Sequence, residues 1–195
     1  GRCDYYVNEA TQSLNYRDVS YMSYHDFPIF LKKGYEKYFW EDYAPRRFGW
    51  TSREDAFEKI YVGVEAMEAY KAHCERISKT WREEFGVPMI TVGRYMCPAE
   101  ILFWGVMGMK GMATAFRRDP DGLEAVIREM RPFANADFFK AISSIKKSTT
   151  AFDYKMTLMA HTIMNQKQFD RFYMPYIEEF WNAIVEYDKT AFIFI

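Results

Sequence analysis

The spacing of apolar side chains predicts a chain built mainly of helices. From Ser52 to Glu84, apolar residues recur every three or four positions, while charged residues fill the opposite face. Thr51 and Glu54 form a capping box at the start of this segment. The pattern predicts one long amphipathic helix, or two helices end to end, whose apolar face needs a partner.

Two shorter helices are predicted before this segment, at residues 26–34 and 35–44. The second should end before Pro45, because a proline disfavours the helical conformation in the residue that precedes it. Near the start of the chain, Tyr5–Val7 predicts a short strand, and the polar stretch after it predicts a loop.

A strand followed by two helices is predicted in the middle of the chain. The apolar, β-rich run Val87–Val92 predicts the strand, and Gly93 allows the backbone to turn after it. The first helix should span Pro98–Arg118, with charges that suit the helix dipole at both ends. Asp119 then caps a second helix, which Pro132 should end.

The last third of the chain combines further helices with two short strands. A loop and a helix are predicted within 132–147, and a strand within Ser148–Thr162. A capping box at Asn165–Gln168 opens a helical segment that Pro175 either kinks or divides in two. The apolar run Ala191–Ile195 predicts a parallel strand buried on both faces.

Composition narrows the classes of partner. The chain has 26 basic and 27 acidic side chains and no cluster of Lys and Arg, which argues against nucleic acid and anionic membranes as partners. No apolar run approaches the roughly 20 residues of a membrane span. Three cysteines without a paired spacing predict reduced thiols and a cytoplasmic location.

Aromatic residues and methionines are abundant, with 17 Phe, 15 Tyr, 5 Trp and 12 Met. They can fill a core, or they can line an apolar pocket for a flat, conjugated ligand. Gly105, Gly108 and Gly111 leave part of one helix bare, which suits a closely packed neighbour or the same kind of ligand. The segment PRRFGW (45–50) pairs two arginines with aromatic residues, as in an anion site or a solvated turn.

Two groups of residues carry candidate chemistry. Arg94, Tyr95, Met96 and Cys97 follow the predicted central strand and form the densest polar and polarisable cluster, so we predict that they bind substrate. Asp153 and His161 lie near the predicted strand in 148–162, where a carboxylate and an imidazole can do acid–base work if they converge.

No metal site is predicted within the chain. His73 and Cys74 are adjacent, so on a helix they point about 100° apart, which is poor geometry for binding one metal ion.

Three segments resemble the uroporphyrinogen decarboxylase superfamily, in particular its members related to corrinoid-dependent methyltransferases. The first is VSYMSYHDFPIFLKKGYEKYFWEDYAPRRFG, and the second runs from the predicted central strand to RRDPDGLEAVIREM. The third, MNQKQFDRFYMPYIEEFWNAIVE, is similar to a family helix with the pattern Met-Ser-x-x-x-Phe-x-x-Phe-x-x-Pro, with Asn165 in place of the serine. The decarboxylase's early arginine-rich loop is not found in this chain.

The resemblance implies an α/β fold that is part of a TIM-type (β/α)8 barrel, helix-rich with few strands. Residues 1–195 would form a single incomplete domain, with flanking regions missing at both ends. A barrel typically needs about 250 residues, and its site lies on loops at the carboxyl ends of the strands. Arg94–Cys97 would lie at such an end.

Three functions are compatible with the resemblance. The first is methyl transfer with a corrinoid protein as partner, using zinc bound by residues outside this chain to activate a thiol acceptor. The second is decarboxylation of a tetrapyrrole without a cofactor. The third is a non-catalytic module that binds a tetrapyrrole or docks to another subunit, and a homodimer is a further partner to consider.

Overall fold

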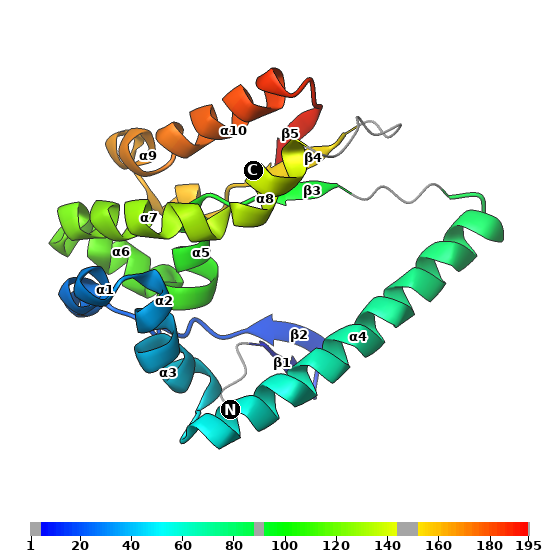
Figure 1. Cartoon of the computed structure of the whole chain (residues 1–195), viewed down its shortest axis with the longest axis horizontal. Helices are drawn as coiled ribbons and strands as arrows, with labels where there is room; N and C mark the ends of the chain where they lie inside the picture. Colours follow the sequence, from blue (N-terminus) through cyan, green and yellow to red (C-terminus); the bar gives the residue numbers. More distant parts are fainter. Residues whose placement is uncertain (1–4, 88–91, 144–151, 195) are drawn as a thin grey trace.

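The computed structural model describes residues 5–87, 92–143 and 152–194 of the 195-residue chain. Helices make up most of this part, and the strands form a two-stranded hairpin and a separate three-stranded sheet (Figure 1). A helix-rich α/β chain with few strands is therefore confirmed.

The three-stranded sheet is parallel. Its central strand β4 (Tyr154–Thr157) lies between β3 (Gly93–Tyr95) and β5 (Ala191–Phe194). The carboxyl ends of all three strands therefore lie at the same edge. The described strands form an open sheet, so closure into a TIM-type barrel stays a prediction.

Strand β3 differs from the sequence prediction. Gly93 was expected to turn the chain, but it pairs with Tyr154 inside the sheet. Of the predicted strand Val87–Val92, residues 88–91 lie outside the described part of the chain. A side chain at position 93 would collide with the Tyr154 ring, so the glycine allows that ring to lie across β3.

The prediction that the last strand is buried on both faces is wrong. Residues 191–193 of β5 are half-buried, and Phe194 is 56% exposed. Among the described strands, β5 has a neighbour only on its β4 side, and an edge strand of this kind keeps part of its surface in solvent.

The N-terminal segment forms a hairpin where only one strand and a loop were predicted. Strand β1 (Tyr5–Asn8) pairs antiparallel with β2 (Ser13–Tyr16), and Gln12 in the turn has a positive φ of 53°. Side chains of β2 stay largely exposed, with Leu14 at 69%, so the apolar pattern gave little sign of a strand there.

The first helical run covers residues 24–48 and is broken at Gly34, where φ is 78°. It consists of a 3₁₀ turn, α1 (Phe27–Lys33), α2 (Tyr35–Tyr38), a π-helical turn (Phe39–Tyr43) and α3 (Ala44–Phe48). The predicted stop before Pro45 is wrong. The Ala44 N–H donates to the Phe39 carbonyl five residues back, and this wider turn carries the helix through the proline, which has no N–H to place.

Helix α4 (Arg53–Glu83) is a single long helix, and none of its residues is buried. Figure 1 shows it as a straight helix set apart from the other helices. Its cap lies one residue later than predicted. Ser52, not Thr51, accepts from the Asp55 N–H at 3.2 Å, and the Asp55 carboxylate accepts from the Thr51 N–H at 2.8 Å.

The predicted helix Pro98–Arg118 has the right ends but is not continuous. It comprises α5 (Pro98–Ile101), a π-helical turn (Leu102–Met107) and α6 (Gly108–Arg118), with a break at Gly108, where φ is 69°. Asp119 caps α7 (Pro120–Ala134) as predicted. Pro132 does not end α7: the helix continues for two residues beyond it, at the loss of the one hydrogen bond that the missing N–H would make.

Four short elements complete the described chain. They are α8 (Ala136–Ile142), a 3₁₀ turn (Ala160–Ile163), α9 (Gln166–Phe172) and α10 (Met174–Glu186). The Asn165–Gln168 capping box is confirmed, and Pro175 lies in the first turn of α10, so the segment divides into two helices. The predicted helix within 132–147 is α8 as far as the chain is described.

The core lies where these helices pack on one another and on the parallel sheet. None of its largest fully buried side chains comes from α4 or the hairpin; they are Met22, Phe27, Tyr38, Tyr95, Leu102, Met107, Met112, Leu123, Ile127, Phe172, Tyr173 and Phe180. The aromatic residues and methionines are thus, in large part, core residues.

Candidate functional site

Tyr95, the last residue of β3, is fully buried and packs edge-to-face on Phe138. Its hydroxyl donates to the Glu179 carboxylate at 2.8 Å, and Arg131 donates to the other oxygen of that carboxylate. Burial and the Glu179 charge raise the pKa of Tyr95 far above its ordinary value. The phenol therefore stays protonated and links β3 to α7 and α10.

Met96 and Cys97 are fixed by backbone contacts. The Asn135 side chain accepts from the Met96 N–H and donates to the Met96 carbonyl, both at 2.8 Å. Cys97 is fully buried, with Sγ 3.8 Å from the Phe172 carbonyl. Burial raises the pKa of Cys97, so its sulfur is a neutral thiol rather than a thiolate.

Arg94 is the exposed member of the predicted substrate-binding group. Its Nε lies 2.7 Å from the sulfur of the half-buried Met96, while the Tyr95 and Cys97 side chains are buried. A ligand that reaches this end of β3 from solvent would meet Arg94 first.

Asp153 and His161 do not converge. Asp153 precedes β4, and its carboxylate accepts from the Thr190 N–H at 2.9 Å and the Thr190 hydroxyl at 3.0 Å. His161 lies beyond the opposite end of β4, with Nδ1 2.9 Å from the Leu158 carbonyl. A strand of four residues separates them by about 13 Å along its axis. Asp153 joins two strands, and the pair has no shared reaction centre.

A buried carboxylate lies close to Cys97. Glu100 is 1% exposed, and its Oε1 accepts from the Met159 N–H at 2.5 Å, from the Ala160 N–H at 2.8 Å, and from the Tyr173 hydroxyl. Its Oε2 has no hydrogen-bond partner among the described residues. Sequence reasoning assigned Glu100 only to the helix dipole, because the turn that it caps lies some 60 residues further along the chain.

The structure places a cavity of about 240 Å³ between the first helical run and the α5–α7 region. Both π-helical turns contribute to it: Phe39 and Tyr43 from one, Gly105 and Val106 from the other. π-Helical turns are rare and recur at functional sites. The remaining walls are almost entirely apolar or aromatic: Met22, Phe30, Tyr35, Tyr38, Ile101, Leu102 and Met130.

Three polar groups meet at one side of this cavity. The Tyr43 hydroxyl donates to the Gly105 carbonyl at 2.7 Å, and Arg47 Nη1 lies 2.6 Å from the Tyr43 oxygen and 2.5 Å from the same carbonyl. A Cβ at Gly105 would lie 3.3 Å from Arg47 Nη1, so a larger residue would push the guanidinium away. The cavity is thus a mainly apolar site with one cationic edge.

The helix break at Gly108 makes this arrangement possible. The N–H groups of Met109 and Lys110 are bound by the Asp18 carboxylate at 2.7 and 3.1 Å, instead of by carbonyls one turn back. The Gly105 carbonyl is therefore available to Tyr43 and Arg47. A side chain at Gly108 would collide with Asp18, so close polar packing explains this glycine.

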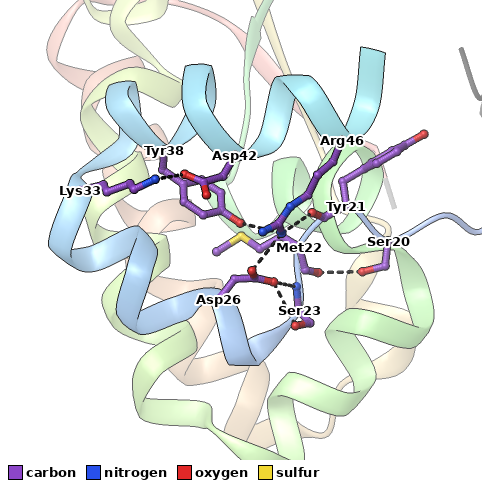
Figure 2. A network of polar contacts seen from close by, with 9 residues as sticks. All are labelled: Ser20, Tyr21, Met22, Ser23, Asp26, Lys33, Tyr38, Asp42 and Arg46. Atoms are coloured by element: carbon purple, nitrogen blue, oxygen red, sulfur yellow. Dashed lines mark hydrogen bonds and ion pairs between the residues drawn. The ribbon is translucent and has the colours of Figure 1, made fainter. Parts of the chain in front are cut away.

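Figure 2 shows the polar network that fixes α3 beside the cavity. Arg46 Nη1 donates to Asp26 Oδ1 at 2.9 Å and to the Tyr21 carbonyl at 3.1 Å, and it lies 3.4 Å from the Tyr38 oxygen. Burial opposes ionisation of Asp26, but the Ser23 N–H and Arg46 outweigh it and hold the pKa of Asp26 below its ordinary value. The network anchors Tyr38, a wall of the cavity.

The sequence contained part of this site. PRRFGW combines arginines with aromatic residues, and the structure puts Arg47 at the cavity and Arg46 in its supporting network. The aromatic walls were not predicted as a set, because residues 30–43 and 101–106 meet only through tertiary packing.

Among the described residues, no group of three or more His, Cys, Asp or Glu side chains is placed to hold a metal ion. In the same part of the chain, no helix has both the length and the apolar character needed to cross a bilayer. Comparisons with protein-family models, with curated proteins and with solved structures found no match for this chain.

Proposed function

We propose that this chain belongs to a methyltransferase-like enzyme of the uroporphyrinogen decarboxylase superfamily and that the cavity between its π-helical turns binds the small methyl donor or acceptor. The three motif segments support the family, and parallel strands joined through helices are compatible with it. Two of those segments contribute walls to the cavity, which links the resemblance to a binding site.

The volume of the cavity is the observation that favours methyl transfer over tetrapyrrole decarboxylation. At about 240 Å³ it lies just below the range of roughly 300 to 1,000 Å³ typical of sites for drug-sized ligands. A single aromatic ring with small substituents suits this space, whereas a four-ring macrocycle does not. Methyl transfer from or to a small compound is therefore favoured over decarboxylation of a tetrapyrrole.

The polar edge indicates what the ligand carries. Arg47 offers guanidinium donors that are always charged, so a carboxylate or another acceptor on the ligand would lie beside it, with the ligand ring against the aromatic walls of the cavity. Arg94, exposed at the end of β3, stays our candidate for contact with an anionic substrate or with a corrinoid partner. Zinc, if used, would come from residues outside this chain.

A binding experiment tests the proposal with 4-methoxybenzoate, which combines one ring, one methyl ether and one carboxylate. We expect saturable binding by calorimetry, weakened at least tenfold by Val106→Phe, which fills the cavity. Val185→Phe is the matched control, because Val185 is 77% exposed and remote from the cavity. Equal binding by the wild type and Val106→Phe, with both variants folded by circular dichroism, would contradict the cavity assignment.

Two further measurements separate the alternatives. With cob(I)alamin added to the full-length enzyme, we expect release of 4-hydroxybenzoate. Binding of coproporphyrin, seen as a shift of its absorbance and unaffected by Val106→Phe, would favour the tetrapyrrole functions instead. Binding of 4-methoxybenzoate without any turnover would leave a binding module.

A further inference from the structure

Helix α4 exposes an apolar face along its whole length. At 31 residues it is about 46 Å long, and Phe57, Met67 and Trp81 are 61%, 66% and 48% exposed. Exposed apolar surface on this scale is rare in monomers and marks an interaction site. Three features indicate which partner covers this face: the spacing of the apolar residues, the distribution of charge along α4, and a cavity near its N-terminal end.

Six apolar residues of α4 occupy positions of one heptad spacing, and Tyr70 and Ile77 flank it. Alternating steps of three and four residues connect Phe57, Ile60, Val64, Met67, Lys71, Cys74, Ser78 and Trp81. A repeat of 3.5 residues is the signature of a two-stranded coiled coil, in which a polar residue at one seam position fixes the register. Lys71 and Ser78 are the polar positions of this seam.

The charges along α4 divide into two halves. Five of the six charged residues from Glu54 to Glu68 are acidic, and four of the five from Lys71 to Arg82 are basic. Two copies side by side in parallel would place acid beside acid and base beside base. Antiparallel copies place each acidic half beside a basic half, apart from the helix ends, where Glu83 and Glu84 lie near Asp55 and Glu54 of the other copy.

We propose that α4 forms an antiparallel coiled coil with a second copy of this chain, with the two-fold axis at Ala69. In this register the seam forms complete layers: Phe57 opposite Trp81, Ile60 opposite Ser78, Val64 opposite Cys74, and Met67 opposite Lys71. The division of charge, which apart from Lys71 rests on residues outside the seam, favours the same antiparallel orientation.

A hollow at the base of α4 fits the same partner. An apolar cavity of about 560 Å³ is lined by Trp40, Trp50, Phe57 and Ile60. The layer that places Trp81 of the second copy opposite Phe57 brings that indole to this hollow. A buried tryptophan in a pocket of the facing copy is a common source of interface affinity.

Substitutions of two valines on one helix test the interface. Val64 lies in the seam and Val62 on the opposite face, and both are at least half exposed, so Lys at either position should leave the fold intact. We expect light scattering to give twice the 23.3 kDa of the chain for the wild type and for Val62→Lys, and a monomer for Val64→Lys. A monomeric wild type at 100 μM, or a dimer unaffected by Val64→Lys, would overturn the proposal.

Disulfide trapping tests the orientation in a Cys3→Ser background. Under oxidation, Val64→Cys should link the new thiol to Cys74 of the second copy, and Val62→Cys should not. Adding Cys74→Ser should abolish the link in an antiparallel pair, whereas a parallel pair would still join the two new thiols to each other. A link that survives Cys74→Ser therefore overturns the antiparallel register.

Discussion

Glu100 is predicted to hold the 3₁₀ turn 160–163 against α5, and its removal should be among the most destabilising single changes in the chain. Its Oε1 accepts three hydrogen bonds while the residue is 1% exposed. Hydrogen bonds to a charged group contribute about 1.5–3 kcal/mol each, and a donor left buried without a partner costs about 1–3 kcal/mol. Glu100→Ala leaves three such donors, so we expect a loss of roughly 3–5 kcal/mol in the free energy of unfolding.

Two conservative variants separate the contributions to this loss of stability. Glu100→Gln keeps an acceptor oxygen but loses the charge and places a new amide N–H₂ where Oε2 has no partner, so about 1–2 kcal/mol should be lost. Tyr173→Phe removes one of the three donors and should cost about 1.5–3 kcal/mol, mainly in the hydrogen bond itself.

Urea unfolding followed by circular dichroism measures these losses, and hydrogen exchange reports the Met159 and Ala160 amides directly. Exchange of both amides should be faster in Glu100→Ala than global unfolding requires. Glu129→Ala, on the exposed side of α7, is the control and should change stability by less than 0.5 kcal/mol. A Glu100→Ala variant as stable as that control would refute the reasoning.

Three further changes test other contacts. Asp26→Asn should destabilise the fold at pH 7. Since the folded-state pKa of Asp26 lies below its ordinary 3.8, its stabilisation is fully present above pH 3.8 and is lost as the pH falls through the folded value, so the gap between urea midpoints should narrow there. Gly93→Ala should cost about 1–3 kcal/mol through collision with the Tyr154 ring, and a Tyr154→Ala background should remove most of that cost in a double-mutant cycle. Cys97 should resist a thiol reagent in the folded chain and react on unfolding in urea, in a background where the other cysteines are serine; rapid reaction in the native state would contradict its burial.

Local signals in the sequence predicted most element positions correctly. Asp119 and Asn165 cap the helices they were expected to cap, and the Pro98 and Arg118 boundaries hold. These features depend on residues within one helical turn of each other, which a sequence displays directly. The errors at Pro45 and Pro132 share one cause. A proline removes only the hydrogen bond of its own N–H, so a π-helical turn at Pro45, or a position two residues from the end of α7 at Pro132, lets the helix continue past it.

The candidate site was less predictable, because its parts are distant in sequence. Tyr95 and Cys97 looked chemically active, yet both point into the core, since alternate residues of a strand face opposite sides and only Arg94 faces solvent. The direction of each side chain depends on which side the helices cover, and that is a property of the tertiary fold. The periodicity of residues 93–97 alone spans too few positions to reveal it.

The two π-helical turns explain why the cavity could not be read from helical periodicity. A π-helical turn inserts one extra residue, which rotates every later side chain by about 100° relative to a regular helix. In the first run this shift brings Tyr38 and Arg47 to the same cavity, although a regular helix would carry them on opposite faces, and in the second it precedes the break that releases the Gly105 carbonyl. A hydrophobic stripe traced at 3.6 residues per turn therefore assigns the wrong neighbours on both sides. The same π-helical turns leave an apolar space between the two helical regions. They also direct Tyr43 and Arg47 toward the Gly105 carbonyl, and the proposed ligand site depends on this arrangement.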